Sequence, residues 1–118
     1  MNTINKQYIE PLDTFFSQAQ QAMDTTRIEE LIGKFALRII DDVEKGKLTP
    51  IEADYIFSFI DDSNQWAEIM HKMNISEIVN DLLFEGQIMH DLGTPQGADI
   101  ERMKKISQML IDHVEESN

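Results

Sequence analysis

Residues 26–62 read TRIEELIGKFALRIIDDVEKGKLTPIEADYIFSFIDD, and this stretch decides the fold. Its first part, residues 27–45, repeats apolar side chains every three or four positions, which gathers them on one face of a helix. The stripe consists of Ile28, Leu31, Ile32, Phe35, Ile39, Ile40 and Val43. Thr26 followed by Glu29 predicts a capping box at the start of this helix, and Gly46 predicts its end.

A second helix follows this one almost at once. Thr49 and Glu52 again have the spacing of a capping box, and Pro50 stands at the first helical position, where a missing N–H is tolerated. The helix carries Tyr55, Ile56, Phe59 and Ile60 and extends to about Asp62. Because the connection between the two helices is short, the sequence predicts an αα-hairpin.

The rest of the chain continues the helical periodicity. It predicts further helices near residues 8–22, 64–73, 76–92 and 96–115. Gly86 lies inside one of them and weakens that prediction, because glycine disfavours a helix interior. No segment shows the alternation that is typical of a strand. The sequence therefore predicts an all-α fold, a compact bundle of five or six helices built around αα-hairpins, in a single domain spanning residues 1–118.

Composition excludes several classes of protein. The chain has no cysteine, so disulfides, thiolate metal ligands and a cysteine nucleophile are absent. No apolar run approaches the roughly 20 residues that a membrane span needs, and the N-terminal residues lack the pattern of a signal peptide. We therefore expect a cytoplasmic protein that does not associate with membranes.

Charge is distributed very unevenly along the chain. Residues 50–101 hold eleven acidic side chains and one basic side chain, Lys72, within a chain whose net charge is −12. Such a field attracts basic partners, and it also keeps proteins soluble. The densest basic group is Arg102, Lys104 and Lys105, which is too small to hold a polyanion beside this acidic window. We expect no direct binding of nucleic acid.

The acidic window contains the only tryptophan of the chain. Asp61, Asp62, Trp66 and Glu68 are the residues that we predict to bind a partner, because an aromatic side chain ringed by polar groups is typical of an interface. The alternative is that Trp66 packs in the core with other apolar residues of its helix, as a single tryptophan at helical spacing usually does.

Signatures of catalysis or metal binding are sparse. Glu68 and His71 have the Glu-x-x-His spacing of helical di-iron sites, but a complete site needs a second such pair and further carboxylates. The sequence contains neither a glycine-rich phosphate loop nor a nucleophile elbow. We therefore assign no catalytic residue, no metal ligand and no cofactor, and we do not expect an enzyme.

Three functional hypotheses follow, in order of preference. The first is a small acidic protein-binding module that neutralises or regulates a basic protein, of the immunity, antitoxin or inhibitor type. The second is a self-associating structural or regulatory protein, in which an apolar seam forms a homodimer. The third is a metal-dependent enzyme. Salt separates the first two, because screening weakens an electrostatic complex and leaves an apolar dimer intact.

Overall fold

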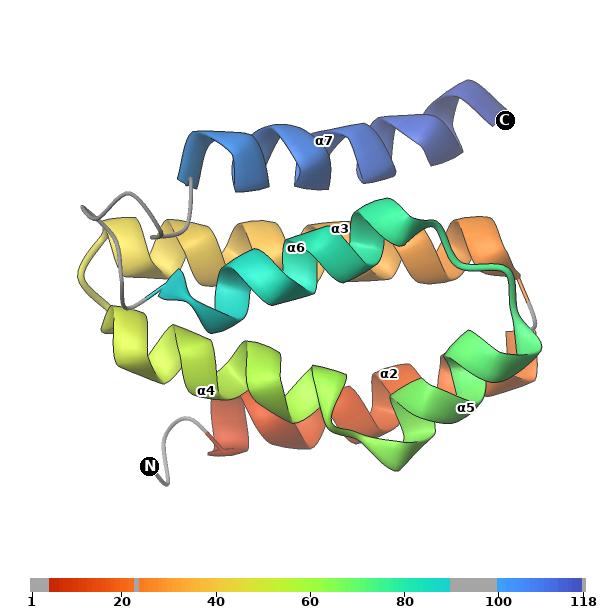
Figure 1. Ribbon diagram of the computed structural model, residues 1–118, viewed down its shortest axis with the longest axis horizontal. Coiled ribbons are helices and arrows are strands. Elements are labelled where there is room, and N and C mark those ends of the chain that lie inside the picture. The colour runs from red at the N-terminus through yellow and green to blue at the C-terminus, as the bar shows by residue number, and fades with distance from the viewer. Residues whose placement is uncertain (1–4, 23, 90–99, 118) are drawn as a thin grey trace.

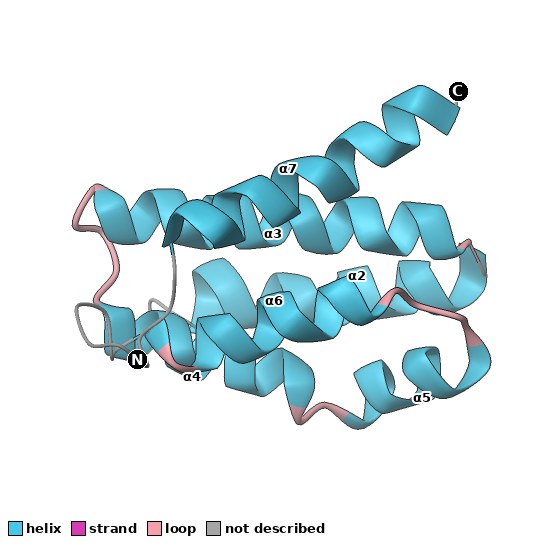
Figure 2. Cartoon of the chain, turned by 45° about the horizontal axis from the view of Figure 1, so that its top comes forward, coloured by secondary structure: helices cyan, strands magenta, loops and turns pink. Residues whose placement is uncertain are grey.

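The structure is a computed structural model that describes residues 5–22, 24–89 and 100–117. Its elements in chain order are η1, a π-helical turn (Asn5–Ile9), and the α-helices α2 (Glu10–Ala22), α3 (Thr25–Glu44), α4 (Pro50–Asp61), α5 (Asn64–Lys72), α6 (Glu77–Gln87) and α7 (Ile100–Ser117). Every element in these ranges is helical, which confirms the all-α prediction (Figure 2). The predicted residues 90–92 of one helix and the predicted start of the last helix at 96 lie outside the described residues.

The long helix α3 is central, and α7 lies alongside it (Figure 1). The pairing of α3 with α7 is the most extensive contact between elements, followed by that of α4 with α6. Helices α2 and α5 contact each other on the other side of the bundle from α7. Helices α3 and α4 are joined by the predicted short connection, yet each makes its main contact with a helix distant in sequence.

Small residues allow the backbones of α3 and α7 to approach closely. A Cβ atom at Gly33 would lie 2.8 Å from the carbonyl oxygen of Ser107 and 3.1 Å from Cβ of Leu110. Ala36, one turn further along α3, is fully buried. The hydroxyl of Ser107, also fully buried, donates a hydrogen bond to the Met103 carbonyl at 2.8 Å, so it brings no unpaired polar group into the interface.

The core runs through the whole bundle and draws on every described helix. Its largest fully buried side chains are Phe16, Ile28, Ile32, Ile39, Ile40, Ile56, Phe57, Ile60, Trp66, Ile69, Leu82 and Leu83. Phe35, which belongs to the predicted stripe of α3, is only partly buried. The stripe therefore marks the inward face of α3 correctly, with Phe35 at its margin.

The ends of the helices bear out two of the three predicted signals. Thr49 and Glu52 form the capping box of α4, with bonds of 3.1 and 2.9 Å. Gly46 has φ of 80° and terminates α3 in a Schellman arrangement, in which the N–H of Lys47 donates to the Asp42 carbonyl at 2.8 Å.

The predicted capping box of Thr26 and Glu29 is wrong. Helix α3 starts earlier, and its N-cap is Asp24, whose carboxylate accepts from the N–H groups of Thr26 and Arg27. Glu29 is buried and accepts a hydrogen bond of 2.9 Å from the backbone N–H of Ser76, the N-cap of α6. The glutamate thus joins the starts of two helices and does not cap its own.

Candidate protein-binding surface

The four residues predicted to bind a partner do not form one cluster. Asp61, Asp62 and Glu68 are exposed, whereas Trp66 is buried. Asp61 accepts a hydrogen bond from Gln87 of α6 at 3.0 Å, and Glu68 accepts one from Gln20 of α2 at 3.2 Å. These two carboxylates are therefore directed towards different neighbouring helices.

Trp66 is a core residue, with only 2% of its surface exposed. Its ring lies against Phe16 of α2 at a centroid distance of 6.4 Å and an angle of 49°. The indole Nε1 is buried and has no hydrogen-bond partner among the described residues. The packing interpretation of Trp66 is thus confirmed, and an exposed tryptophan anchor is not what the structure contains. The reason is that α5 lies on α2, which covers the ring.

Part of the acidic window serves the fold itself. Glu85 is buried in α6, and its carboxylate forms an ion pair of 2.7 Å with Arg102, just beyond the end of the window. Glu52 is held in the capping box of α4, and Asp54 accepts a hydrogen bond from Ser58 at 3.3 Å. These three carboxylates already have partners within the fold, so fewer acidic side chains can contact a partner directly than the count of acidic residues indicates.

Exposed apolar side chains on α4 form a feature that the sequence analysis did not identify. Ile51 is 70% exposed and Tyr55 is 41% exposed, one helical turn apart. Phe59 follows after a further turn and is partly buried. Tyr55, Phe59 and Asp62 line an open hollow of about 410 Å³, together with Ser58 and Ser63. We call Ile51, Tyr55, Phe59 and Asp62 the α4 patch.

A signal for this patch was present in the sequence. Helix α4 has apolar side chains at positions 51, 53, 55, 56, 57, 59 and 60, which is more than one face of a helix can hold. Ala53, Ile56, Phe57 and Ile60 are buried, and Phe57 packs against Gly86 of α6. Of the remaining apolar residues, Ile51 and Tyr55 are exposed and Phe59 is partly buried. Counting the faces of α4, and not only its apolar spacing, would have found them.

The chemistry of the α4 patch suits a cationic protein surface. The Tyr55 ring and the partly buried Phe59 provide apolar contact area, and aromatic rings also attract guanidinium and ammonium groups. The Asp62 carboxylate in the same hollow can accept bidentate hydrogen bonds from an arginine.

Within residues 5–22, 24–89 and 100–117, no group of three or more His, Asp or Glu side chains is placed to hold a metal ion. Glu68 and His71 are both exposed. In that part of the chain, no helix combines the length and apolar content needed to cross a membrane.

Comparison of the chain with protein-family models, with curated proteins and with solved structures yields no match. The proposals below therefore rest on the residues and geometry of this chain.

Proposed function

We propose that this protein is a binding module for a basic protein and that the α4 patch forms the centre of its interface. The observation that carries the proposal is the exposure of Ile51 and Tyr55 on α4, together with the hollow that Tyr55 and Asp62 line. Exposed apolar side chains that lie together, rimmed by polar groups, mark interaction sites on soluble proteins. An aromatic centre with a charged rim is the arrangement in which interfaces concentrate their binding energy.

The charge of the chain supports a basic partner. A net charge of −12 raises the local concentration of cationic proteins and accelerates their association. Asp62 belongs to the hollow, and Asp61 and Glu68 are exposed nearby in the sequence. An inhibitor, antitoxin or immunity protein acts in this way, by covering the basic surface of its target.

The proposal is tested with immobilised protein and an extract of the cells that produce it. A partner should be retained by the wild-type chain, released by salt, and lost when Ile51→Ser and Tyr55→Ser are introduced together. Phe84→Ser is the matched control, since Phe84 is 61% exposed on α6 and is not part of the α4 patch. Equal retention of the same protein by the patch variant and the control would contradict the proposal.

Self-association is the second candidate, and the exposure of Phe84 and Met109 favours it. These residues and Ile51 give the surface apolar side chains that a second copy could cover. Analytical ultracentrifugation at low and high salt separates the two candidates. A dimer that persists at high salt and dissociates in Phe84→Ser or Ile51→Ser would support an apolar homodimer, because screening acts on charges and not on apolar contacts.

A further inference from the structure

A second hollow, of about 290 Å³, lies between α2 and α3 and is independent of the α4 patch. Its floor is formed by the buried side chains of Leu12 and Ile32. Phe15 and Phe35 contribute its aromatic walls and are both only partly buried. The two helices leave this apolar space open, where a closer approach would have buried both phenylalanines.

Two cations of α3, Lys34 and Arg38, line the same hollow one helical turn apart. No Asp or Glu of the described chain belongs to its lining. The two cations lie outside the acidic window of residues 50–101, in the part of the chain that holds nine of its ten lysines and arginines. The hollow therefore combines an apolar interior with a positive rim.

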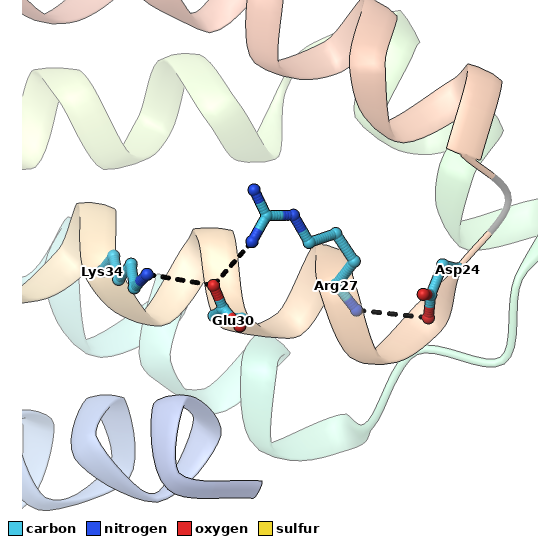
Figure 3. Close-up of polar contacts among 4 residues, drawn as sticks. All are labelled: Asp24, Arg27, Glu30 and Lys34. Carbon is cyan, nitrogen blue, oxygen red and sulfur yellow. Dashed lines mark hydrogen bonds and ion pairs between the residues drawn. The ribbon is translucent and has the colours of Figure 1, made fainter. Parts of the chain in front are cut away.

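The carboxylate that pairs with Lys34 is shared with a second cation. Glu30 accepts both Arg27, at 2.7 Å, and Lys34, at 3.0 Å, so two cations share one negative charge (Figure 3). The guanidinium of Arg38 lies over the ring of Tyr8, 4.7 Å from its centroid, and the Tyr8 hydroxyl donates to Asp42. The α3 side of the hollow therefore retains positive charge that can meet an anion.

We propose that this hollow binds a linear amphiphilic carboxylate of medium chain length, that is, a free fatty acid. The alkyl chain would lie between Phe15 and Phe35 over the apolar floor, and the carboxylate would meet Lys34 and Arg38. A hollow of about 290 Å³ is many times larger than the space that one water molecule needs, so it can take an alkyl chain of medium length.

An anionic ligand is a specific prediction for this protein, because the net charge of the chain disfavours it. The overall field of the chain repels anions and attracts cations, so unspecific adsorption would favour an alkyl ammonium ion over an alkyl carboxylate. Preference for the carboxylate can only come from local charges that oppose this field. Lys34 and Arg38 are the cations that line the hollow.

Isothermal titration calorimetry with decanoate, below its micelle concentration, tests the proposal. Decanoate should bind in a 1:1 ratio and more tightly than decyltrimethylammonium. Shortening the acid to octanoate and then hexanoate should weaken binding about tenfold or more per step, because each buried methylene contributes roughly three- to fourfold.

Variants locate the site. Lys34→Gln and Arg38→Gln should each weaken decanoate binding about fivefold or more, whereas Lys105→Gln, which removes an exposed cation of α7, should leave it unchanged. Leu31→Trp, which narrows the hollow from its wall, should abolish binding. Circular dichroism verifies that each variant is folded. If Leu31→Trp does not fold, Lys34→Gln still tests the site.

The proposal is overturned if decanoate does not bind, or if decyltrimethylammonium binds as tightly. It is also overturned if Lys34→Gln and Arg38→Gln bind decanoate as Lys105→Gln does. Retention of decanoate binding by the Ile51→Ser, Tyr55→Ser double variant is expected, and it separates this site from the α4 patch.

Discussion

The ring of Phe57 in α4 lies directly against the Cα atom of Gly86 in α6. A Cβ atom at position 86 would collide with three atoms of that ring. The glycine that weakens the sequence prediction of α6 is therefore the residue that allows α4 and α6 to pack.

Gly86→Ala should destabilise the protein by about 1–3 kcal/mol, because the added methyl overfills a buried contact. Helix propensity alone predicts the opposite sign, since alanine favours an exposed helix by about 1 kcal/mol over glycine. Urea denaturation gives the free energy of unfolding. Asn80→Ala, at an exposed position of the same helix, is the control and should be nearly neutral. A stabilised Gly86→Ala variant would show that α4 and α6 are not in contact here.

The burial of Trp66 predicts different costs for two substitutions. Trp66→Ala should cost about 3–5 kcal/mol through the cavity it leaves. Trp66→Phe should cost much less, because it also removes a buried N–H that has no partner in the described structure. Since Trp66 is the only tryptophan, its fluorescence reports directly on this site. Acrylamide should quench the folded protein weakly, and quenching as strong as in denaturant would refute the burial.

Phe35 and Phe57 should differ strongly in their contribution to stability. Phe57 is fully buried, so Phe57→Ala should cost about 3–5 kcal/mol. Phe35 stands at the margin of the α2–α3 hollow, and Phe35→Ala should cost only about 1–2 kcal/mol, because the ring is partly exposed before it is removed. Equal losses in thermal or chemical denaturation would mean that the hollow is closed in solution.

The stability of the protein should fall at high pH through Tyr8. Burial, reinforced by the hydrogen bond to Asp42, raises the pKa of Tyr8 from 10.0 to about 12. The folded state holds the phenolic proton more tightly than the unfolded chain, so this stability is fully present below about pH 10 and is lost as the pH rises towards 12. The difference between the Tyr8 pKa values of the folded and unfolded states corresponds to roughly 3 kcal/mol in the free energy of unfolding.

Comparison with Tyr8→Phe isolates this effect, because lysines titrate in the same range in both proteins. The difference in free energy of unfolding by which the wild-type protein exceeds the variant should shrink as the pH rises from about 10 to 12. Tyr55→Phe, at an exposed position, serves as the control. A constant difference between wild type and Tyr8→Phe over this range would mean that Tyr8 is not buried against Asp42.

Charge reversal tests the position of the acidic binding surface. Asp61→Lys combined with Asp62→Lys should change stability by about 1 kcal/mol or less, because both side chains are exposed. The same pair should slow association with the captured partner by about tenfold, since rim charges act mainly on the association rate. Asp13→Lys on α2 with Asp112→Lys on α7 carries the same charge change outside the acidic window and should have little effect. Equal slowing in both variants would indicate a response to total charge only.

The features that could be predicted from the sequence are those encoded over a few neighbouring residues. The capping box of Thr49 and Glu52 and the glycine end of α3 involve partners within five positions, and both could be predicted. Glu29 was assigned wrongly because Ser76, its true partner, lies in another helix. Local spacing cannot distinguish a capping box with Thr26 from a hydrogen bond with Ser76, because the bond with Ser76 forms only after α3 and α6 have packed.

The candidate sites show the same limit of prediction from sequence, which is set by contacts between helices. Asp61, Asp62 and Glu68 are exposed, as is usual for charged side chains, whereas the burial of Trp66 depends on its contact with Phe16 of α2. Ile51 and Tyr55 could have been found from the excess of apolar residues on α4. The α2–α3 hollow could not, because its volume is set by the separation of two helices and not by the identity of any one residue.

The close contact between Gly33 and Ser107 has a consequence for the order of events during protein synthesis. These residues are roughly 70 positions apart, so at about 5–20 residues per second α3 waits several seconds for the helix that covers it. During that time the side of α3 that later meets α7 is accessible to chaperones and to other nascent chains. The central helix of the bundle is thus made early and enclosed late.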